Sequence, residues 1–326
     1  MKQALLNLVI TFLISIIISP LIIKWLRKLK FGQSILIYVE KHKEKSGTPT
    51  MGGIIFILSV VIGYLVFFNK NNTIATISIL SLLFFGTIGF LDDFIKIKFK
   101  QNEGLKPYQK IIGQFGIAIL IALFVYYSDL VGSSVIIPFT NNSIDLGIWI
   151  IPFVVFIYLA IVNSVNLIDG LDGLCGGVSS VVLIVISVIL FLGVGNLSEV
   201  FRNEILNLIV VSFGLVGGIL GFLIFNSYPA KVFMGDTGSL AIGGFLASLV
   251  SLTRQYFLVV IVGFAFVLTA MSVILQVFSY KVFKKRIIKM APLHHHFEQT
   301  YHEVKVVAGY VILSIIVGVL TISMYI

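Results

Sequence analysis

Long apolar runs separated by short polar segments dominate the chain. About ten of these runs have the roughly 20 residues that a helix needs to cross a hydrocarbon core about 30 Å thick. They predict membrane spans near residues 3–23, 52–69, 73–91, 111–128, 147–164, 173–193, 205–225, 237–253, 256–279 and 304–326. Because most connections are too short for separate folded units, we expect one all-α, polytopic membrane domain that comprises residues 1–326.

The composition excludes a soluble globular protein. Hydrophobic residues make up 58% of the 326 residues, charged residues make up 11%, and the mean hydropathy is +1.09, which leaves too little polar surface for a water-soluble fold. Cys175 is the one cysteine of the sequence, so an intrachain disulfide and a multi-cysteine metal site are excluded. The first run lacks a small-residue cleavage site, which favours a retained span over a signal peptide.

Basic residues lie mostly on one side of the predicted membrane domain. Of the 23 Lys and Arg residues, only Lys2, Lys70, Arg202 and Arg254 fall on the other side. The positive-inside rule therefore puts the basic side in the cytoplasm and both termini outside. The net charge of +9 favours contact with anionic headgroups or a polyanionic substrate. Nucleic-acid binding is the weaker alternative, because no recognised nucleic-acid motif accompanies the charge.

Five polar segments interrupt the apolar pattern, and the alternation of spans places all of them on the cytoplasmic side. They cover residues 45–53, 92–96, 163–172, 226–238 and 292–298. Acids, amides, cations and histidines gathered at one water-facing surface indicate a catalytic site. A transporter or channel is the main alternative from another class, but its acidic residues would be expected near the bilayer midplane rather than at span ends.

The second segment contains the adjacent acids Asp92 and Asp93, with Lys96 one helical turn further on. A water-exposed helix end is the structural alternative. Two adjacent carboxylates repel each other, however, and become favourable when a divalent cation or nearby ammonium groups neutralise them. The spacing to Lys96 therefore suits acid–base chemistry beside a phosphate.

The third segment places Asn163, Asn166 and Asp169 three residues apart, on one face if the span remains helical. Carboxamides suit a phosphate or a sugar, while Asp169 and Asp172 can accept hydrogen bonds from ribose or bind a metal. Two Asp-Gly turns at the end of the helix would explain the glycines but not the polar face.

The fourth segment enters a span through Gly235-Asp236-Thr237-Gly238. Asp236 or Thr237 would act only as a helix cap in the structural interpretation. In the functional one, small residues at a helix N-terminus let an oxyanion approach, and Asp236 supplies a hard oxygen ligand for Mg²⁺. Phe233 could stack on a flat ring, although packing is the common role of a single Phe.

The first and last segments are less specific. For His294, His295 and His296 we favour hydrogen bonding to phosphate or sugar over transition-metal binding, with one of the three, taken as His295, moving a proton. Residues 47–53 form either a simple turn with hydroxyl caps or an anion contact, since Lys45 precedes them. They are not a Walker loop, because no Gly-Lys-Ser/Thr follows.

Together these strings resemble the polyprenyl-phosphate N-acetylhexosamine-1-phosphate transferase superfamily over essentially the whole chain. The Asp-Asp pair and Asn-Leu-Ile-Asp-Gly-Leu-Asp-Gly mark the superfamily. Gly-Thr-Pro-Thr-Met-Gly-Gly, Phe-Met-Gly-Asp-Thr-Gly-Ser and Pro-Leu-His-His-His-Phe-Glu resemble the phospho-N-acetylmuramoyl-pentapeptide transferase branch. A UDP-N-acetylglucosamine-1-phosphate transferase is the alternative within the enzyme class, and the histidine triplet and the Thr-Pro-Thr-Met-Gly-Gly string argue against it.

The resemblance assigns roles to individual residues. It implies that Asp236 binds Mg²⁺ and that Asp92 deprotonates or orients the lipid phosphate. The remaining positions that it implicates fall into three groups: Asp93, Asn166, Asp169 and Asp172 in activity or nucleotide contact; Asn163, Asn226 and Phe233 around the uridine; and Lys45, Thr50, Lys96, Lys100 and His294 to His296 at the diphosphate and sugar.

The resemblance also implies a reaction and its setting. Phospho-MurNAc-pentapeptide would pass from UDP-MurNAc-pentapeptide to undecaprenyl phosphate, giving lipid I and UMP, in a homodimer of the cytoplasmic membrane. We expect direct attack by the lipid phosphate rather than an aspartyl intermediate. Since the family has a broken ninth helix and residues 253–280 are long for one span, we also predict a bend near Thr269 to Ser272.

Overall fold

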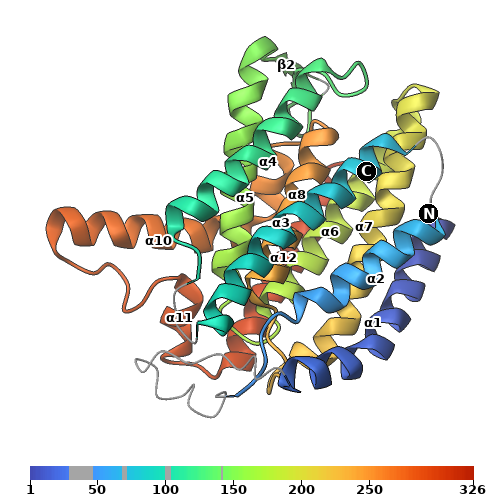
Figure 1. Cartoon of the computed structure of the whole chain (residues 1–326). Helices are drawn as coiled ribbons and strands as arrows, with labels where there is room; N and C mark the ends of the chain where they lie inside the picture. The colour runs from blue at the N-terminus through green and yellow to red at the C-terminus, as the bar shows by residue number, and fades with distance from the viewer. Residues whose placement is uncertain (29–46, 68–71, 100–103, 141) are drawn as a thin grey trace.

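The structure is a computed structural model, and it describes residues 1–28, 47–67, 72–99, 104–140 and 142–326. Lys45 and Lys100, two of the predicted site residues, lie outside the described residues. The all-α prediction is confirmed: long helices form a bundle, and within the described residues the two strands form a small hairpin. The N- and C-termini lie toward the same end of this bundle, away from α11 (Figure 1).

Each predicted span corresponds to helix in the structure. The helices are α1 (Lys2–Lys28), α2 (Gly53–Val66), α3 (Thr73–Lys98), α4 (Pro107–Tyr127), α5 (Ile150–Ile168), α6 (Leu174–Gly193), α7 (Glu199–Asn226), α8 (Gly235–Leu252), α9 (Leu258–Val262), α10 (Phe264–Phe283), α11 (Leu293–Glu298) and α12 (Glu303–Ser323). The described residues also include the short 3₁₀ helices η2 (Gly147–Trp149) and η3 (Val194–Asn196) and the strands β1 (Ser134–Ile136) and β2 (Ser143–Asp145). In the described part of the chain, nine helices are long and apolar enough to cross a membrane, and α2 is shorter, with 14 residues.

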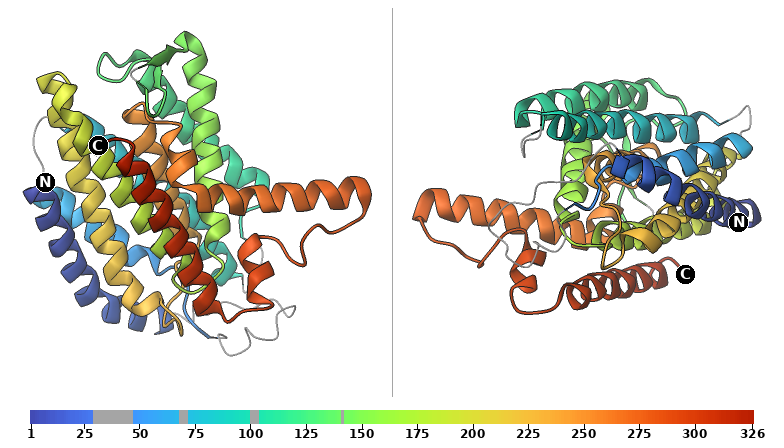
Figure 2. Two further views of the ribbon diagram at one scale, coloured as in Figure 1. Left: turned by 180° about the vertical axis from the view of Figure 1, so that it is seen from behind. Right: turned by 60° about the horizontal axis from the view of Figure 1, so that its bottom comes forward.

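The ninth predicted span is broken, but the predicted position of the break is wrong. It falls at Gly263, between α9 and α10, and α10 continues as one helix through residues 269–272. The hydroxyls of Thr269 and Ser272 donate to carbonyls three or four residues earlier in the same helix, and the helix is continuous at both residues. Beyond the break, α10 runs across the direction of the bundle and projects from it (Figures 1 and 2).

Helices α1 and α7 pack through small and polar residues. Asn7 Nδ2 donates to the Val210 carbonyl at 2.9 Å, and Ser15 Oγ donates to the Gly218 carbonyl at 2.8 Å. Both side chains are buried. Within a membrane, lipid is as apolar as a leucine side chain, so close packing and interhelical hydrogen bonds hold helices together. This polar seam explains why an otherwise apolar first helix carries hydroxyls and an amide at four-residue intervals.

Helices α3 and α8 approach still more closely near the C-terminal end of α3. A Cβ atom on Gly89 of α3 would lie 2.0 Å from the Asp236 carbonyl oxygen, in the first turn of α8. Only glycine permits this backbone-to-backbone approach. The contact therefore sets the last two turns of α3 directly against the N-terminus of α8.

The α1–α7 seam predicts a matched pair of glycine substitutions. Gly217→Ala would bring a Cβ within 2.1 Å of the Leu8 carbonyl oxygen, so we expect a stability loss of about 1–3 kcal/mol and a lower apparent unfolding temperature in detergent. Gly116→Ala in α4 meets no atom within 4 Å and should be neutral or stabilising by up to about 1 kcal/mol. Equal unfolding temperatures for the two variants would contradict the close packing of α1 against α7 at Gly217.

Candidate functional site

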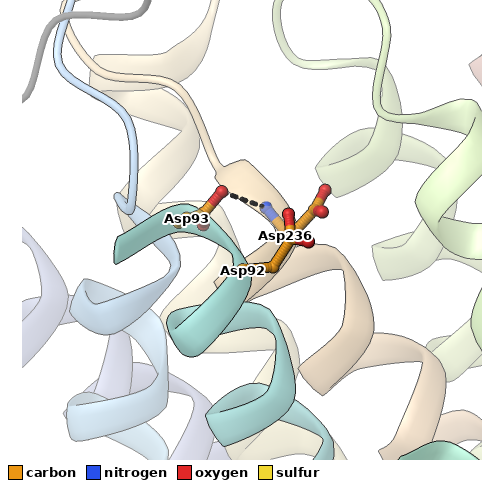
Figure 3. A group of neighbouring side chains, drawn as sticks. All are labelled: Asp92, Asp93 and Asp236. Atoms are coloured by element: carbon orange, nitrogen blue, oxygen red, sulfur yellow. Dashed lines mark hydrogen bonds between the residues drawn. The ribbon is translucent and has the colours of Figure 1, made fainter. Parts of the chain in front are cut away.

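Three carboxylates from two helices meet at one point. Asp92 and Asp93 lie near the C-terminal end of α3 and Asp236 lies in the first turn of α8. One oxygen from each carboxylate lies within 4.8 Å of the others (Figure 3). We call Asp92, Asp93 and Asp236 the acidic cluster. Asp236 is more than 140 residues away in sequence from the adjacent Asp92 and Asp93, and the close contact at Gly89 brings them together.

Asp93 holds the N-terminus of α8 in place. Its carboxylate accepts from the backbone N–H groups of Asp236 (3.3 Å) and Thr237 (2.9 Å) and from the Thr237 hydroxyl (2.7 Å). Helix N-termini leave unpaired N–H groups and favour a negative charge nearby. Asp93 thus serves as a helix cap supplied by another helix, and it fixes the backbone that carries Asp236.

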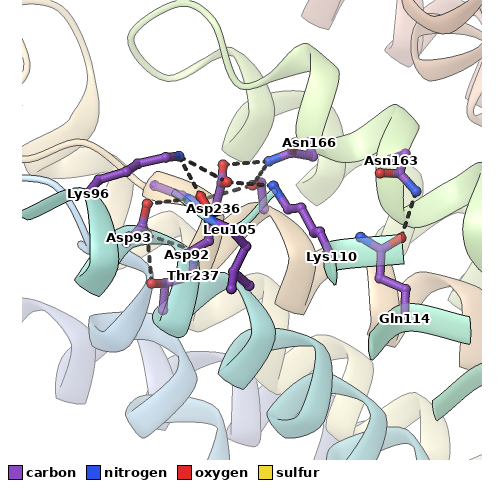
Figure 4. A network of polar contacts seen from close by, with 12 residues as sticks. Asp92, Asp93, Lys96, Leu105, Lys110, Gln114, Asn163, Asn166, Asp236 and Thr237 are labelled. Atoms are coloured by element: carbon purple, nitrogen blue, oxygen red, sulfur yellow. Dashed lines mark hydrogen bonds and ion pairs between the residues drawn. The ribbon is translucent and has the colours of Figure 1, made fainter. Parts of the chain in front are cut away.

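Asp236 is surrounded by donors from three other helices (Figure 4). Its Oδ2 lies 2.6 Å from Lys110 Nζ of α4 and 3.2 Å from Lys96 Nζ of α3. Its Oδ1 accepts from Asn166 Nδ2 of α5 at 2.8 Å, and the same amide group donates to Ser239 Oγ at 2.8 Å. The carboxylate orientation is therefore specified from both sides.

Asp92 completes the charge arrangement. It forms an ion pair with Lys96 at 2.5 Å and accepts from the Leu105 backbone N–H at 2.9 Å. Asp92 and Asp93 are each 2% exposed, so their charges are poorly screened by water. Three carboxylates against Lys96 and Lys110 leave one net negative charge. Clustered carboxylate oxygens are the ligands that Mg²⁺ prefers, so this donor set fits a divalent cation.

Asp169 and the histidines lie beside this cluster. Desolvation, followed by the nearby charges of Asp236, Asp93 and Asp172, raises the pKa of Asp169 well above its usual range. A Cβ on the adjacent Gly170 would lie 2.4 Å from His294 Nε2 and 2.9 Å from His295 Nε2. The C-terminal end of α5 therefore contacts the acidic cluster through Asn166 and lies beside the histidine segment at Gly170.

The short helix α11 presents the three histidines differently. His294 is fully buried, and neither ring nitrogen bonds to a residue that the structure describes. His295 Nδ1 pairs with Glu298 at 2.8 Å, and His296 Nδ1 accepts from the Lys289 backbone N–H at 3.3 Å. The Glu298 contact orients the His295 ring.

Helix α10 anchors the segment before α11. Gln276 accepts through Oε1 from the backbone N–H groups of Ile287 and Ile288 and donates through Nε2 to the Ile288 carbonyl. Ser272 Oγ accepts from the Leu293 N–H at 3.0 Å. The histidines are therefore tied to the projecting helix α10 as well as to Gly170.

Several predicted site residues have structural contacts. Asn163 donates to Gln114 Oε1 at 2.8 Å, away from the acidic cluster (Figure 4). Buried Asn226 donates to the Val232 carbonyl and accepts from the Gly173 N–H. Asp172, also buried, accepts from the Ala230 N–H at 3.0 Å. Asn226 and Asp172 thus hold the 227–234 connection that leads to Asp236.

Thr50 and Phe233 lie on the side of the cluster formed by the segment before α2. Thr50 Oγ1 would be 2.7 Å from a Cβ placed on Gly235. The Phe233 backbone donates to the Pro49 carbonyl and accepts from the Gly52 N–H, each at 2.8 Å. These bonds join the first polar segment to the fourth, as convergence of the segments predicts.

Lys110 is the main site residue that sequence reasoning did not select. It was counted only among the basic residues, yet its ammonium is the nearer of the two that contact Asp236. A signal was present: Lys106, Lys110 and Gln114 recur every four residues at the start of an apolar helix. That spacing puts them on one face.

Comparison with known proteins gives consistent matches. Residues 75–254 match the family model described as glycosyl transferase family 4, and residues 45–57 match signature 1 of the phospho-N-acetylmuramoyl-pentapeptide-transferases. A protein of that name from Thermoanaerobacter sp. (strain X514) is 46% identical over 318 residues, 97% of this chain and 96% of the relative. Another from Clostridium novyi (strain NT) is 42% identical over 312 residues, 95% and 93% of the two chains.

Burial of His294 predicts a pH dependence of stability. Desolvation, followed by the neighbouring His295, lowers the pKa of His294 to about 3, against about 6.5 for an exposed histidine. Between these two pKa values the unfolded chain binds more protons than the folded chain. The stabilisation from burying His294 in its neutral form is therefore complete above about pH 6.5 and is lost as the pH falls toward 3. Between about pH 6.5 and pH 5 the loss reaches about 2 kcal/mol.

The measurement is the apparent unfolding temperature in detergent across this pH range. His294→Gln removes the titrating ring, so its unfolding temperature should fall less steeply than that of the unaltered protein. Parallel curves for the two proteins would contradict the assignment.

Proposed function

The chain belongs to the phospho-N-acetylmuramoyl-pentapeptide-transferase family, and from this premise we propose how its acidic cluster carries out the family reaction. The enzyme transfers phospho-MurNAc-pentapeptide from UDP-MurNAc-pentapeptide to undecaprenyl phosphate, and the products are lipid I and UMP. This is the first membrane step of peptidoglycan synthesis. Both reactants are anions, so repulsion between them forms part of the barrier.

The observation that carries the assignment of this site is the pairing of Asp92 and Asp236 with two lysines. Lys96 and Lys110 converge on Asp236 from different helices. Ammonium groups held rigidly in a poorly hydrated site stabilise the charge that develops on phosphate oxygens during transfer. Because the carboxylates hold these cations before substrate binds, little reorganisation is needed.

In the proposed mechanism, an oxygen of the lipid phosphate attacks the sugar-linked phosphorus of the UDP substrate directly. The bond from that phosphorus to the bridging oxygen breaks, and UMP leaves with this oxygen. Asp92 accepts the proton of a monoprotonated lipid phosphate or orients the dianion. Lys96, which contacts both Asp92 and Asp236, would then lie between the attacking and leaving groups.

We propose that Mg²⁺ binds to the acidic cluster, with Asp236 as its main protein ligand. The support is the set of three carboxylates whose oxygens lie within 4.8 Å of one another. When bound, the ion neutralises non-bridging phosphate oxygens. Asp93 contributes mainly by holding the helix N-terminus beneath Asp236.

The substrate side of the proposal uses the surrounding polar residues. Gly170 lies beside His294 and His295, and the ring nitrogens of buried His294, which pair with no described residue, would bond to the sugar or its phosphate while His295 moves a proton. Asn163, Asp172 and Asn226 support the nucleotide pocket. The remaining proposed contacts to the UDP-sugar are Lys45, Thr50, Lys96, Lys100, Asn166, Phe233 and His296.

Helix α10 supports access for the lipid substrate. Apolar side chains along it, including Ile274 and Phe278, are more than half exposed, and Ser272 and Gln276 on the same helix hold the histidine segment. We infer that the polyprenyl chain lies against α10 with its phosphate directed to the cluster.

The setting of the enzyme is also part of the proposal. One membrane domain of residues 1–326 would lie in the inner, cytoplasmic membrane with both termini outside and the cluster facing the cytoplasm, in accord with the basic loops. A homodimer is proposed from the family resemblance.

Turnover provides the first test. UMP release should require UDP-MurNAc-pentapeptide, undecaprenyl phosphate and Mg²⁺ together, and should stop when a chelator removes the metal. Asp236→Asn should lower the rate about 1,000-fold or more, because the charge that holds the lysines and the ion is lost.

Asp129→Asn is the matched control, since Asp129 is exposed in the connection after α4 and should retain the starting rate. Release of UMP from UDP-N-acetylglucosamine at a comparable rate would overturn the substrate assignment.

Lys110 provides a second test. Lys110→Gln removes the ammonium 2.6 Å from Asp236, so kcat should fall about 100-fold or more. Lys98→Gln removes an equal charge from exposed Lys98, at the end of α3, and should leave kcat nearly unchanged. Similar losses of kcat in the two variants would show that kcat depends on the overall charge and not on the contact between Lys110 and Asp236.

A further inference from the structure

A second basic site lies apart from the acidic cluster, at the ends of α1 and α7. A pocket of about 610 Å³ is lined there by four cations: Lys24, Arg27 and Lys28 from the last turns of α1, and Lys231 from the connection between α7 and α8. None of the described residues that line it is acidic. Four like charges around one concavity repel each other, so an anion bound among them would be stabilised.

The cations at the end of α1 have an alternative explanation, because basic residues favour a helix C-terminus. That explanation does not account for Lys231, which comes from a different segment and faces the same pocket. Lys24, Arg27 and Lys28 are also placed by spacing on one face of the helix rather than around it. Convergence of two elements on one hollow indicates a ligand.

The position of the pocket identifies the class of ligand. Helix α1 has 27 residues and is therefore about 40 Å long, against about 30 Å for the hydrocarbon core. Its last turns consequently extend into the headgroup layer. At that depth the anions nearest to these cations are lipid phosphates.

Apolar surface adjoins the cations on the bilayer side. Pro20, Ile23 and Phe225 form the rest of the pocket lining. Earlier in α1, Ile17 and Leu21 are each 68% exposed and continue the apolar surface away from the charges. A ligand with a phosphate at one end and acyl chains at the other matches this order of groups.

We propose that this pocket binds the phosphodiester headgroup of an anionic phospholipid of the bilayer, with the acyl chains along α1. The site is separate from the proposed catalytic residues. Lys231 lies in the connection that Asn226 and Asp172 hold, so the lipid would fasten one end of that connection to the membrane.

Tryptophan fluorescence offers a direct test, because the chain has two tryptophans and one of them, Trp25, lies between Lys24 and Arg27. Trp149→Phe leaves Trp25 as the sole emitter. The full-length protein in nanodiscs would be exposed to brominated phosphatidylglycerol or brominated phosphatidylcholine at equal mole fraction. We expect stronger quenching by phosphatidylglycerol, and added salt should weaken that preference.

Charge removal makes the test specific. In the Trp149→Phe background, Lys24→Gln, Arg27→Gln and Lys231→Gln together should remove the preference, since each cation near an anionic headgroup contributes about fivefold in affinity. The control removes three cations elsewhere, through Lys281→Gln, Lys284→Gln and Lys285→Gln, and should keep it.

Three results would overturn the proposal: equal quenching by the two lipids, a preference that survives loss of the three pocket cations, or loss of the preference in the control. Millimolar inorganic phosphate distinguishes the two sources of the phosphate group. If it abolishes the preference, the pocket holds a free anion and the lipid assignment fails.

Discussion

The contact between Gly89 of α3 and the first turn of α8 is the constraint on which the site depends. It lets two helices meet backbone to backbone, and Asp93 then satisfies the open N–H groups of α8. These two features place Asp236 beside Asp92 and within reach of both lysines. The proposed chemistry thus rests on packing and capping, which are fixed before any substrate binds.

Much of this arrangement was predictable from sequence. The spacing of apolar runs predicted the helices, and their alternation placed five polar segments at one end. The structure joins four of them through Asn166, Asp93 and the Phe233 backbone, and the histidine segment lies beside Gly170. The separate roles of Asp92 and Asp93 were not predictable. They depend on which carboxylate faces α8, and that is decided by a contact between residues more than 140 positions apart.

Other differences have similar causes. Lys110 was overlooked because a basic residue near a helix start is common in membrane proteins, and its partner lies on another helix. The break in the ninth span was expected at hydroxyl residues, but these bond within their own helix. Gly263, at which α9 ends and α10 begins, is one of 29 glycines, and sequence pattern does not distinguish it from those that serve close packing.

The crowding at Gly89 also bears on how the enzyme can change under selection by inhibitors. A compound that occupies the acidic cluster could be rejected if α3 and α8 moved apart, but any side chain on Gly89 would collide with the Asp236 carbonyl. The same collision would disturb Asp236 and the lysines that we propose for turnover. Resistance through substitution of Gly89 should therefore reduce growth, so antibacterial compounds that contact the acidic cluster beside Gly89 should be difficult to evade by this route.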